Sequence, residues 1–342
     1  MLTGPQASAL AALGAGSTRL ADLAELSSPG RVLLWAGGTA TVAVARPDGS
    51  IERVVVEHRE TVVAGSWAWL SGSRLNLLEP RSALTRTAAG RSSREQVLAV
   101  DLDAVLICIS AAAPIRLGRV ERWLALAWDS GAEPVVVLTK SDLMTRDDVL
   151  EQTRAVSPGA SVHLVSSVTG EGVQALAAQH AGPGRTLALV GSSGAGKSSL
   201  VNALTGSDLD VGGIRESDGR GRHTTVARTL IELPGGGVLL DTPGLRGLAL
   251  HDSGEGLAGA YPEITDLALD CRFSDCQHHG EPDCAIRSAV EAGLLDPDRV
   301  ARHEKLAREL AWQESRRDAS LRAERSKELR RWGRALKNQP HR

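Results

Sequence analysis

The sequence predicts an α/β protein of several domains, in which a parallel sheet lies between a small β-barrel and a helical region. Three observations lead to this prediction. Short strands with hairpin turns occupy residues 31–82, continuous apolar runs alternate with helical spacing over residues 95–250, and only helical patterns follow from residue 251. Apolar runs of this kind are typical of parallel strands that are buried on both faces of a sheet.

Composition excludes several classes of protein. The 342 residues carry a formal charge of −2 and are 42% apolar, so the chain is neither mostly disordered nor fibrous. No apolar run reaches the roughly 18 residues of a membrane helix, and the N-terminus lacks the early positive charge of a signal peptide. Four cysteines in so long a chain do not indicate a disulfide scaffold. We therefore expect a soluble, cytoplasmic protein with no membrane partner.

Basic residues are unevenly placed along the chain. Residues 301–342 contain 13 Lys and Arg against 6 Asp and Glu, so a basic tail follows an acidic body. Residues 1–300 contain only two lysines, Lys140 and Lys197, although arginine is common there. Because an ammonium and a guanidinium are not interchangeable, each remaining lysine marks a position at which arginine does not substitute.

The N-terminal third is expected to form a barrel after a leader. Residues 1–30 are predicted to be this leader, which is expected to be partly disordered and could include one Ala/Leu helix. The sequence Pro47-Asp48-Gly49 predicts a hairpin turn. The predicted strands are 31–35, 39–45, 51–56, 66–70 and 75–78. Several short strands without a helix indicate a small barrel, and the polar residues 80–95 are expected to be a linker.

The rest of the chain alternates strands with helices and then becomes helical. The predicted strands are 104–109, 134–138, 162–165, 186–190 and 238–240. Helical spacing is found at 117–128, 173–179 and 197–204, and then at 263–269, 285–292 and 297–337. Cys108 falls in the first of these strands and is expected to be a core residue.

A phosphate-binding loop follows the strand 186–190 and opens a helix. It matches the pattern G-x-x-x-x-G-K-[ST] with Gly191, Ser192, Ser193, Gly194, Ala195, Gly196, Lys197 and Ser198. Glycines allow backbone N–H groups to turn toward phosphate oxygens, and the helix N-terminus favours negative charge. We expect Lys197 to reach the β- and γ-phosphates and Ser198 to coordinate Mg²⁺. Ser199 is included among the nucleotide-binding residues.

Two motifs indicate recognition of guanine. Thr139-Lys140-Ser141-Asp142 ends the strand 134–138 and resembles the [NT]-K-x-D motif of GTPases, with Thr139 in place of the more usual asparagine. Asp142 is expected to accept both N–H donors of guanine, a pair that adenine lacks, while the stem of Lys140 covers the base. Ser166 and Ser167 resemble the S-A-x loop that closes over guanine.

The switch regions follow the phosphate loop. Asp241-Thr242-Pro243-Gly244 resembles the D-x-x-G switch, in which Asp241 would hold Mg²⁺ through water and the Gly244 amide would sense the γ-phosphate. A Gly-rich and charged segment ends in His223-Thr224-Thr225, as a first switch would. Thr225 is the preferred Mg²⁺ ligand and Thr224 the second choice.

The order of these motifs predicts a circular permutation. Ordinary GTPases carry the phosphate loop first and the guanine-reading motifs last, whereas here the guanine-reading motifs begin at residue 139 and the phosphate loop at residue 191. The same sheet can form, but the second switch then lies next to whatever follows residue 250.

A cysteine–histidine cluster predicts a metal site. Cys271, Cys276, His278 and Cys284 fall within 14 residues, a spacing that suits one structural Zn²⁺ with tetrahedral ligands. Four ligands leave no open position for catalysis. His279 is an alternative to His278, and unpaired surface thiols are the alternative to a site.

The permuted order, the run Gly221-Arg222-His223-Thr224-Thr225 and the C-x4-C-x-H-x5-C cluster together resemble the RsgA family of bacterial GTPases, which depend on the small ribosomal subunit. The resemblance is strong over residues 95–320, whereas residues 31–80 fit by strand pattern only. It implies an OB-fold at 31–82, a circularly permuted P-loop GTPase domain at 95–250 and a helical zinc-binding domain with a basic tail at 251–342.

The resemblance also implies GTP hydrolysis that the small subunit stimulates late in its maturation, with contacts to rRNA. The cofactors would be Mg²⁺ with GTP and one structural Zn²⁺, and we expect a monomer. Aromatic residues are only 3% of the chain, so Trp35, Trp67 and Trp69 are expected in the barrel core rather than stacked on bases. The tail arginines would attract phosphates without reading sequence.

Catalysis is predicted to be slow without a partner. Leu245 follows D-x-x-G where Ras-like enzymes have a water-positioning glutamine. His223 is the candidate substitute, with Lys197 and Thr225 as the other catalytic residues. A loop histidine without a catalytic role is the alternative. A second function stays open, namely an RNA-binding assembly scaffold whose nucleotide site only switches shape or has decayed.

Overall fold

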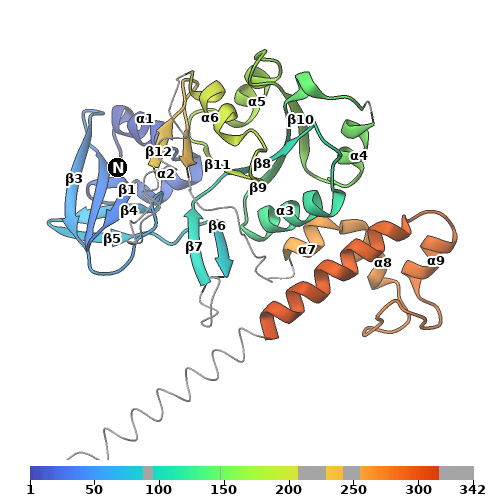
Figure 1. The fold of residues 1–342 in the computed structure, drawn as a ribbon. Coiled ribbons are helices and arrows are strands. Elements are labelled where there is room, and N and C mark those ends of the chain that lie inside the picture. The colour runs from blue at the N-terminus through green and yellow to red at the C-terminus, as the bar shows by residue number, and fades with distance from the viewer. Residues whose placement is uncertain (88–94, 147, 207–228, 242–254, 316–342) are drawn as a thin grey trace, which may run out of the picture.

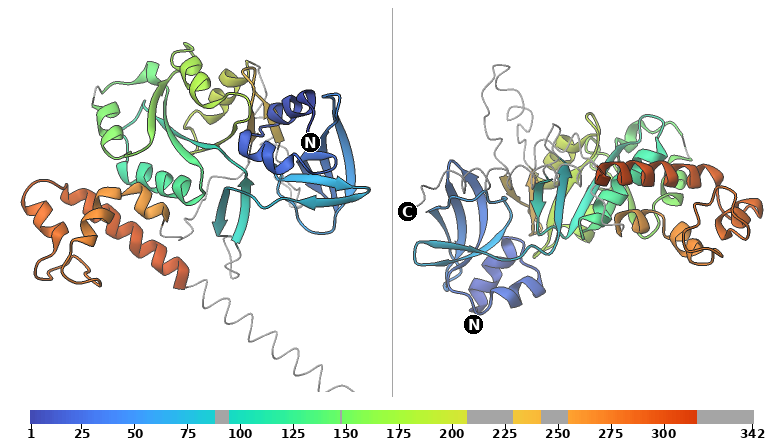
Figure 2. Two further views of the ribbon diagram at one scale, coloured as in Figure 1. Left: turned by 180° about the vertical axis from the view of Figure 1, so that it is seen from behind. Right: turned by 90° about the horizontal axis from the view of Figure 1, so that it is seen from below.

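The structure is a computed structural model that describes residues 1–87, 95–146, 148–206, 229–241 and 255–315. Figure 1 shows three regions, a β-barrel, a central sheet flanked by helices and a C-terminal group of helices. The view from behind in Figure 2 shows the barrel and the C-terminal helices at opposite ends of the central region. Over the described ranges, no helix combines the length and the apolar character that crossing a bilayer requires.

The barrel is a five-stranded antiparallel sheet. Its strands are β1 (Pro29–Ala36), β2 (Thr39–Ala45), β3 (Ile51–Glu57), β4 (Trp67–Ser71) and β5 (Arg74–Leu77). They lie in the order β3-β2-β1-β4-β5, and the edge strands β3 and β5 contact each other, so the sheet curls into an OB-like barrel. Trp67 is 1% exposed, as expected of a core residue, but it packs in the cluster with Leu10 and Leu23 of the N-terminal segment rather than in the cluster of the barrel interior.

The prediction of a partly disordered leader is wrong. Residues 1–30 contain α1 (Gly4–Ala12) and α2 (Ser17–Leu23) and the start of β1. Leu10 and Leu23 are fully buried in one cluster with Trp67 of the barrel. Helices of this length are marginal by themselves, and burial against the barrel holds them.

The expected linker at 80–95 also forms regular structure. Strands β6 (Ala83–Thr87) and β7 (Glu95–Val100) make an antiparallel pair, and residues 88–94 between them lie outside the described part of the chain. Leu84 and Leu98 are buried in the core on one face of the central sheet. The polar composition of residues 80–95 concealed the apolar anchor Leu84, while Leu98 lies just beyond them.

The central sheet has six strands in the order β10-β9-β8-β11-β13-β12. They are β8 (Ala104–Ser110), β9 (Glu133–Thr139), β10 (Ser161–Val165), β11 (Thr186–Val190), β12 (Thr229–Glu232) and β13 (Val238–Asp241). All neighbours are parallel except the edge pair β12 and β13. The structure confirms the five predicted strands. It also contains β12, which the sequence did not reveal because its apolar run is short.

Helices cover both faces of this sheet. Helix α3 (Leu117–Asp129) covers one face, where it packs on Val105 and Ile107. Helices α5 (Val173–His180) and α6 (Lys197–Thr205) cover the other, where Leu106 and Cys108 point. Burial raises the pKa of the Cys108 thiol to about 12, so this cysteine is a core residue as predicted. The short helices η1 (Ser141–Leu143) and α4 (Val149–Ala155) follow β9.

The C-terminal helices extend the α3 side of the core. They are α7 (Glu255–Ala260), α8 (Pro262–Leu269), α9 (Ala285–Glu291) and a long helix described over residues 297–315. Leu306 and Leu310 of the long helix share a buried cluster with α3. Glu121 of α3 is fully buried and forms ion pairs with Arg299 (2.9 Å) and Arg302 (2.8 Å), which fixes the long helix to α3.

A second buried junction connects the barrel to the start of β11. Arg31 of β1 is fully buried and donates to Leu13 O (2.6 Å), Gly65 O (2.8 Å) and Thr186 Oγ1 (2.8 Å). Burial lowers the pKa of Arg31 to about 10, so the guanidinium stays charged at neutral pH. Three segments of the chain therefore meet on one side chain, and the barrel is held against the strand that leads to residue 191.

Candidate active site and metal centre

The predicted nucleotide motifs gather at one edge of the central sheet. Strands β8, β9, β10, β11 and β13 are parallel, so their carboxyl ends meet at the same edge. Four of these ends lead directly into a motif, at Thr139, Ser166, Gly191 and Asp241. Ligands of open α/β sheets bind at this edge. Folding therefore brings together motifs that lie far apart in the sequence.

The phosphate loop, residues 191–198, is held in shape by its glycines. Gly191, Gly194 and Gly196 all have positive φ angles, which L residues rarely adopt. A Cβ atom at Gly191 would lie 2.3 Å from the carbonyl oxygen of Cys108, so the backbone passes too close to β8 for any side chain. Lys197 donates from Nζ to Gly191 O (2.8 Å) and Ser192 O (2.7 Å), which places the ammonium over the loop.

Thr139 connects the guanine-reading motif to the phosphate loop. Its Oγ1 donates to Ala195 O at 2.7 Å and lies 3.2 Å from Ile109 O. A hydroxyl therefore provides the contact between the two motifs at a position where an asparagine is more usual. The sequence pattern did not reveal this role, because it depends on the spacing between β9 and β11.

The remaining guanine-reading residues are positioned by local backbone geometry. Lys140 has a left-handed conformation (φ 59°) that ends β9 and begins η1, and Asp142 in η1 is exposed. Ser166 is fully buried, and its Oγ accepts hydrogen bonds from Val168 N (3.2 Å) and Thr169 N (3.1 Å). The serine thus shapes the turn that carries Ser167, while the carboxylate of Asp142 is open to a ligand.

Most of the predicted switch residues are not among the residues that the structure describes. His223, Thr224, Thr225 and Gly244 lie outside the described residues. Asp241 ends β13, next to β11, and only its backbone is described. Their assignments stay predictions from the sequence.

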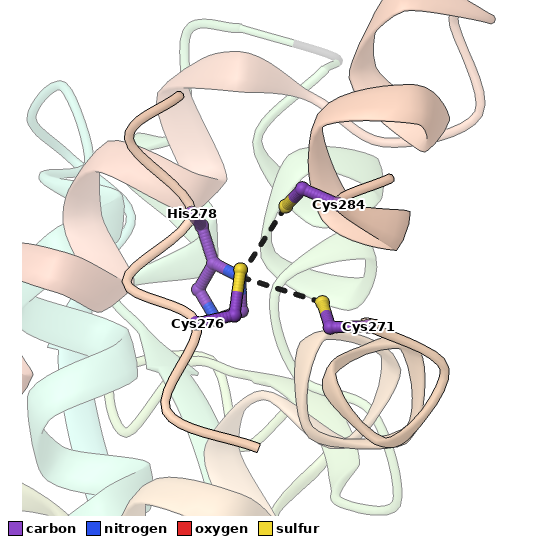
Figure 3. Close-up of side chains that lie close together, drawn as sticks. All are labelled: Cys271, Cys276, His278 and Cys284. Atoms are coloured by element: carbon purple, nitrogen blue, oxygen red, sulfur yellow. Dashed lines mark hydrogen bonds between the residues drawn. The ribbon is translucent and has the colours of Figure 1, made fainter. Parts of the chain in front are cut away.

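The four predicted metal ligands converge in the C-terminal region (Figure 3). The ligand atoms of Cys271, Cys276, His278 and Cys284 all lie within 4.8 Å of one another. His278 Nδ1 is 3.6 Å from Cys271 Sγ and 3.5 Å from Cys284 Sγ. Structural zinc sites are built from cysteine sulfur and histidine nitrogen donors. The four residues therefore fit an ion with tetrahedral coordination. His279 is exposed, and its Nδ1 lies 2.6 Å from Gln277 O, so His278 is the histidine that faces the thiols.

Two sets of hydrogen bonds shape the metal loop, residues 271–284. Cys284 caps α9 and its Sγ accepts from Arg287 N at 3.5 Å, which fixes the sulfur at 1% exposure. The Glu281 carboxylate accepts from Gln277 N (3.0 Å), His279 N (2.9 Å) and Gly280 N (3.0 Å). The backbone N–H of Glu281 itself, followed by those of Gly280, Gln277 and His279, lowers the pKa of this carboxyl to about 2. No pattern in the sequence indicates this role of Glu281, since a lone glutamate in a loop belongs to no motif.

Backbone groups also favour the ionised form of one ligand. Burial raises the pKa of the Cys271 thiol, but hydrogen bonds from the backbone N–H groups of Ala285 and Ile286, together with those from the thiols of Cys276 and Cys284, outweigh burial and hold this pKa below its usual value. The thiolate is the form that binds a metal. The loop therefore offers a metal ion at least one ligand whose deprotonation the fold assists.

Comparison with protein families and known proteins agrees with this geometry. The family model described as RsgA GTPase matches residues 77–251. The small ribosomal subunit biogenesis GTPase RsgA of Streptomyces coelicolor is 46% identical over 261 residues, which cover 75% of this chain and 71% of that protein. The protein of the same name from Opitutus terrae is 44% identical over 272 residues, covering 78% of this chain and 74% of the relative.

Two solved structures share the fold. YjeQ from Thermotoga maritima matches with a TM-score of 0.63 and 25% identity, covering 83% of this chain and 98% of that one. YloQ, described as a circularly permuted GTPase, matches with a TM-score of 0.58 and 22% identity over 84% of this chain and 96% of that one. Both likenesses cover more than four fifths of this chain, and the description of YloQ agrees with the permuted order of the motifs. The chain therefore belongs to the RsgA GTPase family.

Proposed function

We propose that this chain hydrolyses GTP to GDP and phosphate and acts in the biogenesis of the small ribosomal subunit. The bond from Thr139 Oγ1 to Ala195 O carries the proposal, because it joins a guanine-reading motif to a phosphate loop at one sheet edge. Relatives that are 42–47% identical are named small ribosomal subunit biogenesis GTPases. Ribosome assembly would place the protein in the cytoplasm, as a monomer with GTP or GDP and the subunit as its partners.

In this proposal the exposed carboxylate of Asp142 selects guanine, and Lys140 covers the base. The backbone N–H groups of the phosphate loop, Lys197 and the start of α6 bind the phosphates. Ser198, Thr225 and Asp241 would hold Mg²⁺, which supplies positive charge at the β- and γ-phosphate oxygens when it is bound. Each of these groups stands at, or directly after, the carboxyl edge of the sheet or in the first switch.

The motif pattern lacks the residue that usually positions the attacking water molecule. The side chain of Leu245 has no polar atom to orient a water molecule, and His223, in the predicted first switch, is the candidate substitute. We assign His223 to this role once a partner has ordered the first switch. Hydrolysis would then be slow for the isolated protein and faster on the subunit.

The metal centre is assigned to a structural Zn²⁺ in the same proposal. Four protein ligands close a tetrahedral shell, so no position is left for a substrate. Such a site would stabilise the loop between α8 and α9, next to the core that Cys284 shares with α3. The barrel, this region and the basic residues after 315 are the proposed rRNA contacts.

The decisive experiment is single-turnover hydrolysis of GTP with and without purified small subunits. We expect a slow rate alone and a strong increase with subunits. His223→Ala should lose the increase while keeping its affinity for GTP, since a group that acts only in the transition state contributes nothing to ground-state binding. Asp142→Asn should bind GTP more weakly, whereas Glu151→Gln, an exposed carboxylate change in the same domain, should not.

Two outcomes would count against the proposal. If the parent binds GTP and the subunit yet never hydrolyses GTP, the nucleotide is only a switch and the scaffold function is correct. If His223→Ala is stimulated as strongly as the parent, another group positions the water.

A further inference from the structure

An arginine-lined pocket lies against the phosphate loop on the side of α3. It has a volume of about 710 Å³ and is lined by Ser192 and Ser193 of the loop, by Arg116, Arg119 and Arg122, and by Arg302 of the long helix. A second pocket of about 500 Å³ shares Ser192, Arg116 and Arg119 with it. Within the described part of the chain, the lining of neither pocket contains a carboxylate.

Two of the four arginines are already paired. Arg122 forms a bidentate contact with Glu309, and Arg302 pairs with the buried carboxylate of Glu121 at 2.8 Å. These pairs fix the wall that α3 and the long helix share.

The other two arginines are available to a ligand. Arg116 is the N-terminal cap of α3 and Arg119 lies in its first turn, and both are exposed. Among the described residues, neither side chain has a hydrogen bond or an ion pair. Two guanidinium groups on one wall, with no acidic neighbour in the lining, form a site of positive charge.

We propose that this pocket binds a phosphate ion through Arg116 and Arg119, and that its ligand is the inorganic phosphate that leaves the phosphate loop after hydrolysis. This inference rests on the proposed function for the origin of the ion. Guanidinium forks match the oxygens of phosphate and form charge-assisted hydrogen bonds with them. The shared residues Ser192 and Ser193 place the pocket directly beside the loop in which the γ-phosphate would be cleaved.

The location has a consequence for the C-terminal region. Arg302 lines the pocket and also holds Glu121, so the wall that faces the ion belongs to the junction between α3 and the long helix. Occupation of the pocket therefore adds negative charge beside an ion-pair network in which Arg299 and Arg302 share the buried carboxylate of Glu121, while Arg299 also pairs with Glu263 and Arg302 with Asp296. Release of phosphate would therefore change the charge next to the junction between α3 and the long C-terminal helix.

The test measures binding of inorganic phosphate to the full-length protein without turnover. The linewidth of the ³¹P signal of phosphate is followed with protein that is saturated with a non-hydrolysable GTP analogue and Mg²⁺, so that the phosphate loop itself is filled. We expect the parent to broaden the signal. Arg116→Gln and Arg119→Gln should each weaken binding by about tenfold, the loss expected for one charge-assisted hydrogen bond.

The matched control is Arg154→Gln, which removes an exposed arginine of the same domain that lines neither pocket. It should bind phosphate as the parent does. All variants should retain analogue affinity, which shows that the site has folded. Because no hydrolysis is required, a protein that binds the analogue but does not hydrolyse GTP still allows this measurement, and the two failures are therefore distinguishable.

Three results would overturn the inference. The first is phosphate binding that disappears when the analogue fills the loop, because the loop would then be the binding site. The second is equal binding by the parent and by the two pocket variants. The third is a short RNA oligonucleotide that loses affinity in both pocket variants although the parent does not bind free phosphate, since the ligand would then be a phosphodiester.

Discussion

The phosphate loop and the metal loop both present several ligand groups from a short run of residues, but different forces hold them. The phosphate loop is shaped by glycines at positive φ, by close packing on Cys108 and by the hydroxyl of Thr139. In the metal loop, three thiols and an imidazole converge, and the half-buried carboxylate of Glu281 accepts three of the backbone hydrogen bonds that support it. The phosphate loop, which must bind and release nucleotide, is therefore held in shape by the protein itself. The metal loop can instead be held in shape by an ion that stays bound.

The largest effect is expected from removal of a metal ligand. Cys276→Ser should lower bound zinc from one equivalent per chain and leave the loop between α8 and α9 unfolded, because zinc binding in small structural sites contributes about 10–16 kcal/mol of folding free energy. Metal analysis and amide hydrogen exchange measure this. Cys108→Ala, a change at a buried cysteine outside the cluster, should keep the zinc. Full protection of the loop in zinc-free Cys276→Ser would show that the protein alone holds it.

A smaller but specific effect is expected at Gly191. In Gly191→Ala the new Cβ would lie 2.3 Å from Cys108 O, so the loop must shift. Overpacking of this kind costs about 1–3 kcal/mol, which predicts GTP binding roughly tenfold to hundredfold weaker. Gly194→Ala is the matched control, since its Cβ meets nothing within 4 Å and only the φ of 78° is strained. Equal losses in the two variants, measured by titration with a fluorescent GTP analogue, would exclude steric packing as the cause.

Thr139→Val tests the connection between the two nucleotide motifs. The change keeps the shape of the side chain but leaves the buried carbonyl of Ala195 without its donor, at a cost of about 1–3 kcal/mol. We expect GTP affinity to fall about tenfold with the C-terminal region unchanged. Thr153→Val removes a comparable buried bond to Val149 O (2.7 Å) and should lower thermal stability without changing GTP affinity. The connection is unimportant if the two variants bind GTP equally well.

The smallest effect is expected at Glu281. Because its pKa is lowered to about 2, the carboxylate stabilises the loop above the usual pKa of about 4.5, and this contribution is lost as the pH falls through 2. The metal ligands take up protons in the same range, so the effect is best measured at pH 7. At pH 7, Glu281→Gln should release zinc to a chelator somewhat faster than the parent does. Unchanged release would mean that the ion alone orders the loop.

Much of the fold and of the nucleotide site was predictable from the sequence, since both depend on local patterns. Apolar runs identified five strands of the central sheet, and fixed spacings identified the phosphate loop and the cysteine–histidine cluster. Residues 1–30 and 80–95 were misjudged because tertiary burial, rather than local pattern, orders them. Leu10, Leu23 and Leu84 are apolar anchors in these segments of small or polar residues.

The arginine-lined pocket and the buried junctions could not be predicted at all. Arg116 and Arg302 are far apart in sequence and meet through the packing of the long helix on α3. Arg31 is one arginine among many, and only its complete burial distinguishes it. The role of Thr139 likewise depends on a distance between two strands, which no spacing along one of them encodes.

The most direct test of the difference between the two loops is GTP binding before and after removal of the metal by a chelator, with hydrogen exchange of both loops followed in the same samples. The account predicts that residues 271–284 lose protection while GTP affinity changes by no more than about twofold, the range expected for independent sites. A parallel loss of GTP affinity, or a metal loop that stays protected without its ion, would contradict it.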